Sequence, residues 1–306
     1  MRCYYLAGAR STRNGTGSVG VSSLFFLQLT FLEVFKLDLP VTKSRIRLLG
    51  VPWDANSSYL RGAAQAPAAI RGALRCDAST SWSETGVDTG LPGIFGDEGD
   101  LEFGNGEHWF TQTENAAEGL ARECMPLFLG GDHSVTYPLV RGVARKHSGL
   151  TIVHFDAHPD LYENYENNPY SHASPFARIM EEKLAARLIQ VGIRTLNPHQ
   201  KAQAEKFGVE VREMRAGRVD LAGMKIQGPV YVSFDLDVLD PAFAPGVSHR
   251  EPGGLSVREA IGYLHSLPAV IVAADLVELN PVQDVSGVSA TVCAKLVKEL
   301  VGMMAR

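Results

Sequence analysis

The sequence predicts an α/β protein built on a single doubly wound parallel sheet. Apolar runs of strand length alternate with helical patterns of ten or more residues, and this alternation is typical of parallel strands joined by crossover helices. Some runs, such as residues 270–274, are apolar at every position, as expected of strands buried on both faces. At 306 residues with 45% apolar content the chain is long enough for one large core, and residues 45–306 contain no segment typical of a flexible linker.

The individual elements follow from apolar runs, helical periodicity and turn residues. The first core strand is expected at 45–52, closed by Pro52, and the first helix at 66–74, with Pro67 in its first turn. Residues 76–105 are rich in Gly, Ser, Thr and Asp, which predicts irregular structure with at most one short strand near 93–95. The other strands are expected at 127–129, 150–155, 187–191, 209–212, 229–234 and 270–274. The other helices are expected at 111–123, 134–146, 176–180, 198–207, 256–265 and 286–302.

Residues 1–40 differ in character from the main domain, which we place at 41–306. Arg2, Arg10 and Arg13 stand among Ser, Thr and Gly, and no acidic residue precedes Glu33. This pattern is compatible with an organellar targeting peptide, but it fits equally well a misplaced start codon or an arm that packs on a neighbouring subunit. We therefore expect a cytoplasmic protein, or a mitochondrial one if residues 1–40 are a transit peptide. No apolar run is long enough to span a membrane.

The charge balance and the cysteines exclude some classes of protein. The 29 basic and 34 acidic residues give a mild negative excess, without the basic stripe that binding to a phosphate backbone requires, so no nucleic-acid partner is expected. The four cysteines are far apart and follow no metal-binding spacing. We expect them to be reduced thiols in an intracellular compartment.

The first chemical signal is a pair of carboxylates after the apolar run 229–232. Asp235 and Asp237 lie two residues apart in an extended segment, so their side chains project to the same face. Two adjacent anions repel each other unless a cation lies between them, and hard carboxylate oxygens suit a divalent metal ion. An acidic loop at a sheet edge is the alternative interpretation of this stretch.

Two further strand ends carry the same kind of residue. Asp156, His158 and Asp160 follow the run 150–155 at every second position, and His133 follows the apolar residues 126–129. Ligands in open α/β sheets collect outside the carboxyl ends of the strands, so we expect all three clusters to form one metal site. Imidazole and carboxylate ligands without thiolates argue against structural zinc and are compatible with manganese, iron, cobalt or nickel.

These clusters resemble the signatures of the ureohydrolase family, the arginases and agmatinases. The resemblance rests on Gly-Gly-Asp-His-Ser, Asp-Ala-His-Pro-Asp and Ser-Phe-Asp-Leu-Asp-Val-Leu-Asp-Pro, and it extends from Arg45 to the C-terminus. It is closest to the plant-type arginases through residues 156–160, 170–180 and 245–255. The resemblance implies a three-layer arginase-like fold with about eight strands and a centre of two Mn²⁺ ions that hydrolyses guanidino compounds.

The resemblance also implies a role for individual residues. One manganese ion is expected on His133, Asp156, Asp160 and Asp235, and the other on Asp156, His158, Asp235 and Asp237. The expected catalytic residues are Asp160, which transfers a proton to the leaving amine, His172, which shuttles protons, and Glu278, which binds the guanidinium group. The expected substrate-binding residues are Glu278, Asn164, Asn168, Asn197 and His249.

The expected reaction is hydrolysis of L-arginine to urea and L-ornithine. Asn164 and Asn168 offer amide donors for the α-carboxylate, whereas Glu163 and Glu166 favour a dication. Agmatine, which would give putrescine and urea, and other guanidino acids therefore remain alternative substrates. Tyr162 and Asn197 occupy positions where animal arginases carry other substrate contacts, which weakens direct transfer of their recognition.

Two alternative classes of protein fit the sequence less well, and the oligomeric state is expected from the family. A deacetylase-like amidohydrolase would use one zinc ion and lacks the paired Asp-x-Asp and Asp-Ala-His-x-Asp sets. A noncatalytic homologue that serves as an assembly or regulatory subunit is disfavoured because His172, Glu278 and all the ligands are present. The family forms trimers and hexamers, so we expect a homotrimer or homohexamer in which the apolar arm Ser22–Phe35 contacts a neighbouring subunit.

Overall fold

A computed structural model describes residues 43–306, and the expected N-terminal extension, residues 1–40, lies outside the described residues. The described chain forms one sheet of eight strands in the order β2-β1-β3-β8-β7-β4-β5-β6, and all neighbouring strands are parallel. The strands are β1 (Ile46–Gly50), β2 (Phe95–Asp100), β3 (Met125–Leu129), β4 (Leu150–Phe155), β5 (Ala185–Ile193), β6 (Glu210–Glu213), β7 (Pro229–Asp235) and β8 (Val270–Val277). The α-helices are α2 (Ala66–Leu74), α3 (Trp109–Glu123), α4 (Thr136–Ala144), α5 (Pro175–Glu181), α6 (Pro198–Phe207), α7 (Val257–Ser266) and α8 (Val288–Met304).

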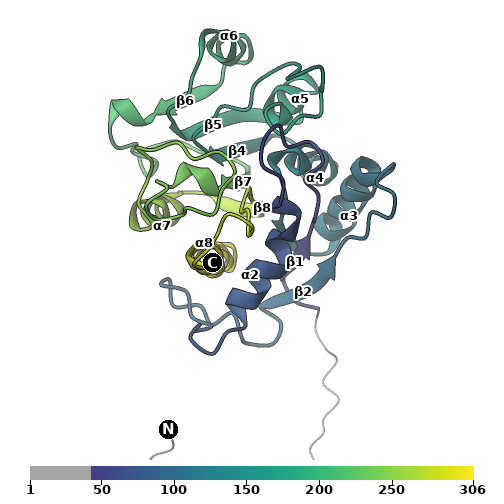
Figure 1. The fold of residues 1–306 in the computed structure, drawn as a ribbon. Helices are drawn as coiled ribbons and strands as arrows, with labels where there is room; N and C mark the ends of the chain where they lie inside the picture. Colours follow the sequence, from purple (N-terminus) through teal and green to yellow (C-terminus); the bar gives the residue numbers. More distant parts are fainter. Residues whose placement is uncertain (1–42) are drawn as a thin grey trace, which may run out of the picture. The chain divides into compact units, whose positions relative to one another are not determined.

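The helices cover both faces of the sheet and give three layers. Helices α2, α7 and α8 share one hydrophobic cluster with one face, and α3, α4, α5 and α6 share another cluster with the opposite face. Figure 1 shows α7 and α8 on one side of the strands and α3 and α4 on the other. The expected doubly wound α/β fold is confirmed. None of the helices in residues 43–306 is long and apolar enough to cross a membrane.

The edge strand β2 is longer than the sequence predicts. A short strand was expected near 93–95, but the strand continues through the polar residues of Phe95–Asp100, which have no apolar periodicity. Its pairing with β1 is supported from α2, where the guanidinium of Arg71 donates to the carboxylate of Asp97 and to the carbonyl of Gly99. An edge strand needs only one pairing partner, so buried apolar residues are not required for its formation.

The central strand β8 also extends beyond the expected range and includes a carboxylate. Asp275 lies inside the strand and is fully buried. Three hydroxyl groups, those of Thr136, Tyr231 and Ser233, donate hydrogen bonds to its two oxygens at 2.6–2.9 Å. Because these hydrogen bonds compensate the carboxylate for its loss of water, Asp275 can be buried within the strand, which continues to Val277.

The register of the central strands brings the functional segments together. The neighbours β3, β8, β7 and β4 all end at the same edge, and Phe155 pairs with Phe234 while Asp235 pairs with Val277. The residues that follow these pairs, Asp156 and Glu278, therefore flank the end of β7. This is the edge at which a parallel α/β sheet forms its binding sites.

Candidate metal centre and substrate pocket

A buried ring nitrogen faces three carboxylates at this edge. The Nδ1 atom of His133 lies 3.2 Å from Asp156 Oδ2, 3.1 Å from Asp160 Oδ2 and 3.1 Å from Asp235 Oδ2. Burial by itself lowers the pKa of His133, but the three carboxylates that face Nδ1 raise that pKa well above its ordinary value. The arrangement therefore requires a positive charge beside this nitrogen, which a metal ion can supply.

The hydrogen bonds of the other ring nitrogen indicate which form of His133 suits a metal. The Ser233 hydroxyl donates its single proton to Asp275 at 2.7 Å, so it must accept from His133 Nε2 at 3.0 Å. With the proton on Nε2, the neutral ring directs the lone pair of Nδ1 at the carboxylate oxygens. Among the described residues Nδ1 has no hydrogen-bond partner, and an imidazole oriented through its second nitrogen is the usual form of a metal ligand.

A second group shares Asp156 with the first. His158 Nδ1 lies 2.9 Å from Asp237 Oδ2 and 3.4 Å from Asp156 Oδ1, and these three side chains are close enough to hold one ion. Asp156 thus presents Oδ2 to His133 and Oδ1 to His158. Burial, together with the charges of Asp237 and Asp156, raises the pKa of Asp235 well above its usual range. The carboxylates repel one another, and divalent cations would relieve that repulsion.

The two carboxylate oxygens of Asp235 have different partners. Its Oδ2 lies near His133, but its Oδ1 accepts a 2.7 Å hydrogen bond from the backbone nitrogen of Asp237 at the start of the short 3₁₀ turn. All six expected ligands nevertheless lie together at the ends of β3, β4 and β7. Their residue types fit two adjacent ions, because His133 faces three of the carboxylates, His158 faces two, and none of these six residues is a cysteine.

Two non-glycine residues at the site have left-handed backbone conformations. Asp160 has φ 51° and Glu278 has φ 63°. This conformation is unfavourable for a side chain with a Cβ atom, so it persists only where surrounding contacts enforce it. Glu166, Asn167 and Lys183 share this conformation elsewhere, but among the described residues only Asp160 and Glu278 combine it with burial at the site, where such strain is often functional.

His172 is buried and hydrogen-bonded through both ring nitrogens. Nδ1 lies 3.0 Å from Glu278 Oε1, Nε2 lies 2.9 Å from Ser58 Oγ, and only 8% of the residue is exposed. Burial lowers the pKa of His172, but the hydrogen bond and charge of Glu278 outweigh it and raise the pKa to about 9. The polar sequence around His172 gave no sign of this burial, and its backbone nitrogen donates to the carbonyl of Asn56, in a loop distant in sequence.

A pocket opens above these groups. Its wall includes His172, Glu278 and four of the expected ligands, and its rim includes Tyr162, Asn197 and His249. Of the expected substrate-binding residues, Asn164 is exposed and Asn168 is bonded to Asn56 and Tyr170, and neither lines the pocket. The structure therefore does not place these two amides at the substrate, because Asn164 is exposed and the Asn168 amide is bonded to other loop residues.

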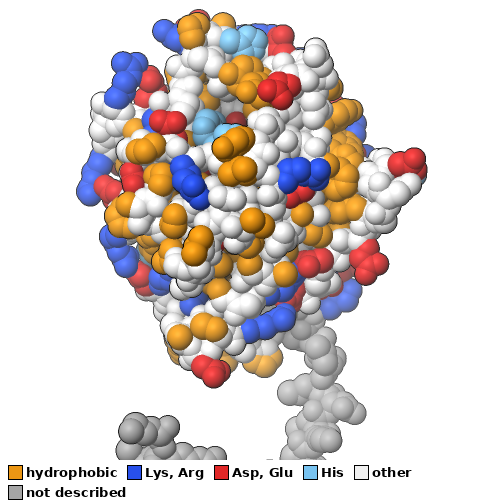
Figure 2. Space-filling model, in the orientation of Figure 1, with side chains coloured by type: hydrophobic (Ala, Val, Ile, Leu, Met, Phe, Trp, Pro, Cys, Tyr) orange, Lys and Arg blue, Asp and Glu red, His pale blue; other side chains and the backbone are white. Residues whose placement is uncertain are grey.

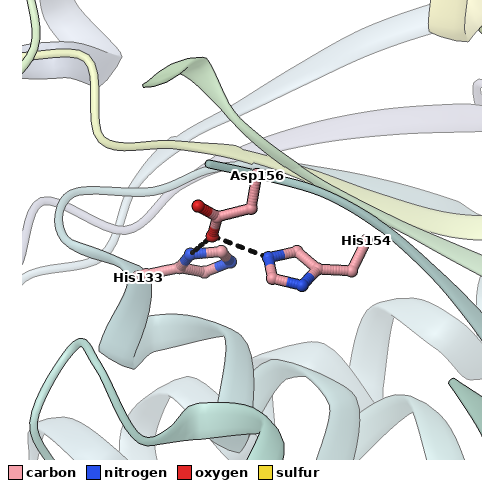
Figure 3. A group of neighbouring side chains, drawn as sticks. All are labelled: His133, His154 and Asp156. Atoms are coloured by element: carbon pink, nitrogen blue, oxygen red, sulfur yellow. Dashed lines mark hydrogen bonds and ion pairs between the residues drawn. The ribbon is translucent and has the colours of Figure 1, made fainter. Parts of the chain in front are cut away.

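Several residues at the site were not identified from the sequence. Ser58 lies in a polar loop without any spacing signal, and its contact with His172 depends on two loops that are far apart in sequence. Ser233 could have been identified, because it lies two residues before Asp235 and so shares its face of the strand. His154, which the sequence favours as a structural residue, also joins the cluster, with Nε2 2.7 Å from Asp156 Oδ2 (Figure 3).

The parallel sheet and the histidine–carboxylate cluster at its carboxyl edge are the features of a metal-dependent enzyme. A model of the Arginase family matches residues 44–302, and the chain belongs to this family. It is therefore a hydrolase of carbon–nitrogen bonds in small guanidino compounds, which confirms the class expected from the motifs.

Relatives and solved structures agree with this assignment. The chain is 46% identical to "Arginase 1, mitochondrial" of Arabidopsis thaliana over 282 residues, covering 86% of this chain and 82% of the relative. It is 35% identical to the guanidinopropionase of Pseudomonas aeruginosa, covering 85% of this chain and 87% of that protein. The structure of an arginase from Medicago truncatula superposes with a TM-score of 0.81 at 42% identity, covering 87% of this chain and 88% of that one.

Proposed function

We propose that this chain is an arginase that hydrolyses L-arginine to urea and L-ornithine at a centre of two Mn²⁺ ions. The observation that carries the proposal is His133 Nδ1, which faces three buried carboxylate oxygens beside a pocket that also contains Glu278. The plant relatives that carry the name arginase, at 44–46% identity, support arginine as the substrate.

Each ion is assigned to four side chains, and Asp156 and Asp235 belong to both sets. His133, Asp156, Asp160 and Asp235 would hold one ion, and Asp156, His158, Asp235 and Asp237 would hold the other. When bound, two adjacent divalent ions lower the pKa of water and supply hydroxide near neutral pH, which attack on a resonance-stabilised guanidinium requires.

Glu278 orients the substrate. Its carboxylate lies at the pocket wall, and a carboxylate can accept two parallel hydrogen bonds from a planar guanidinium group. Burial by itself would raise the pKa of Glu278, but the hydrogen bond and charge of His172 and the hydrogen bond from the backbone nitrogen of His133 lower it. Glu278 is therefore charged at neutral pH and fixes the guanidinium carbon above the cluster.

His172 moves the proton that the leaving amine requires. Near neutral pH the imidazolium donates from Nδ1 to Glu278 and from Nε2 to Ser58, because its pKa is raised to about 9. A guanidinium bound to Glu278 neutralises part of the negative charge of that carboxylate, which otherwise stabilises the imidazolium of His172. Substrate binding therefore lowers the pKa of His172 and favours proton release, with Asp160 as the second carrier next to the reacting carbon.

Agmatine is the second candidate substrate, and one observation favours it. Within residues 43–306 no Lys or Arg lines the pocket, so the α-carboxylate of arginine has no cationic partner on its wall. On the other hand, Glu163 is exposed and paired with Lys206 at 3.0 Å, which reduces its repulsion of a carboxylate. Hydroxyl and amide donors on the rim, such as Tyr162, are sufficient to bind a carboxylate directly or through water.

Steady-state kinetics with both substrates in the presence of Mn²⁺ test the proposal. We expect kcat/KM for arginine to exceed kcat/KM for agmatine. A preference for agmatine of about tenfold or more, which corresponds to about 1.4 kcal/mol in transition-state binding, would overturn the assignment of arginine. Absence of urea release from both substrates would contradict the function itself.

Two further proposals concern the targeting role of the N-terminal segment and the assembly of the chain. We propose that residues 1–40 direct the chain to mitochondria, as the names of its plant relatives suggest, and that the mature protein is a homotrimer or homohexamer. Isolated mitochondria should import the full chain but not a chain that begins at Lys43. Light scattering should give three or six subunits for the full chain. If residues 1–40 instead form an arm that packs on a neighbouring subunit, removal of residues 1–36 should moderately weaken that assembly. A monomer at micromolar concentration would contradict the assembly, and equal import of both chains would contradict the targeting role.

A further inference from the structure

One amide on β5 contacts the expected ligand segment at two points. Gln190 is fully buried and lies opposite His154 in the register of β4 and β5. Its Nε2 atom is 3.1 Å from His154 Nδ1 and 2.6 Å from the carbonyl oxygen of Pro159. The reversed amide would place Oε1 against that carbonyl oxygen, so the nitrogen must lie there and donate both of its protons.

The first contact determines how Asp156 is held. Because Gln190 donates to His154 Nδ1, the proton of the neutral ring lies on Nε2, which is 2.7 Å from Asp156 Oδ2. Figure 3 shows this oxygen directed at both His133 and His154. The His154 ring stacks on Phe176 with centroids 3.9 Å apart, so it cannot turn away. Asp156 is thereby fixed with Oδ2 toward His133 and Oδ1 toward His158.

The second contact fixes the other end of the same segment. Pro159 lies between His158 and Asp160, and Asp160 adopts its left-handed conformation directly after the carbonyl that Gln190 holds. One side chain therefore restrains both carboxylates of Asp-Ala-His-Pro-Asp, the first through an imidazole and the second through the backbone.

The other atom of the amide indicates that these contacts have a function. Gln190 Oε1 is buried and has no hydrogen-bond partner among the described residues. A buried polar atom without a partner opposes folding, and such atoms in native proteins are often explained by a functional requirement on the same group. Here the requirement is the pair of bonds that the nitrogen donates.

We propose that Gln190 is a positioning residue for the metal centre, and that it sets the affinity for Mn²⁺ through His154 and Pro159. This inference rests on the proposed two-metal centre. Groups that orient a ligand from behind commonly change metal affinity by about 10- to 100-fold when they are removed.

The test is the affinity for Mn²⁺ of the Gln190→Met variant, measured by competition with a chelator. Methionine keeps the length of the side chain and removes both donors. We expect Mn²⁺ to bind about tenfold more weakly or worse, and excess Mn²⁺ to restore kcat with KM for arginine unchanged within about twofold. Gln203→Met is the matched control, because Gln203 is also buried but lies on α6, and its affinity should equal that of the wild type.

A second variant tests the route through His154. His154→Phe keeps the stacked ring and removes the donor to Asp156, so it should also weaken Mn²⁺ binding. In the double variant the fold-loss in Mn²⁺ affinity should be smaller than the product of the two single fold-losses. The reason is that both changes break the same chain of hydrogen bonds, from Gln190 through His154 to Asp156. Losses that multiply in full would overturn the relay through His154.

The outcomes also separate this inference from the proposed function. A wild-type chain that binds no Mn²⁺ would contradict the metal centre itself. If the wild type binds Mn²⁺ and Gln190→Met binds it within twofold of the wild type, the inference on Gln190 is overturned. If Gln190→Met does not fold, His154→Phe decides alone, and an affinity within twofold of the wild type overturns the inference.

Discussion

Replacement of Asp235 by alanine is expected to remove most of the bound metal and nearly all activity. Asp235 Oδ2 lies 3.1 Å from His133 Nδ1, and the carboxylate is assigned to both ions. Loss of a group behind a ligand costs up to about 100-fold in metal affinity, so the loss of a ligand shared by two ions should cost more. Elemental analysis of the purified variant should give well under two Mn²⁺ per chain, and activity should fall in parallel.

Asp240 provides the matched control, since it belongs to the same acidic run. Its carboxylate accepts hydrogen bonds from the backbone nitrogens of Ala242, Gly253 and Gly254, which lower its pKa, and it does not line the pocket. Asp240→Ala should keep both ions and most of the activity. Two ions per chain in Asp235→Ala would show that the assignment of this carboxylate is wrong.

The sequence predicted most of the sheet because the central strands carry their own signal. Residues 270–274 and 229–232 are apolar at every position, and only a strand that lies between other strands favours such a pattern. Strand β2 was placed poorly because its residues are polar and its pairing depends on contacts from α2. Asp275 was expected to follow β8, since its burial depends on hydroxyl groups from β7 and from α4 that no local pattern reveals.

The candidate ligands were predictable for a related reason. Each lies at the end of a buried strand or a few residues after it, so strand identity and residue type were sufficient to place it at the carboxyl edge. Ser58 and Gln190 were not predictable as part of the site, because they contact His172 and His154 from a loop and a strand that are distant in sequence. The loop residues Asn164 and Asn168 were expected to bind substrate from their residue type alone. In the structure Asn164 is exposed and the Asn168 amide donates to Asn56.

Glu278→Gln is expected to lower kcat/KM for arginine on the order of 10²- to 10⁴-fold while both metal ions stay bound. The glutamine keeps the shape of the side chain and an oxygen that can accept from His133 and His172, so the wall of the pocket remains intact. What is lost is the charge that meets the guanidinium. Hydrogen bonds to charged groups contribute about 1.5–3 kcal/mol each, and a bidentate pair would therefore account for two to four powers of ten.

The metal content separates this effect from damage to the centre, because Glu278 is assigned to the substrate and not to an ion. Glu163→Gln serves as the control, since Glu163 is exposed, does not line the pocket and is paired with Lys206, and its kcat/KM should stay within about twofold of the wild type. A Glu278→Gln variant with two ions per chain and a kcat/KM within tenfold of the wild type would rule out Glu278 as the guanidinium anchor. The pocket would then have to hold the substrate through its hydroxyl groups and the ions alone, which would leave the left-handed backbone of Glu278 without a functional reason.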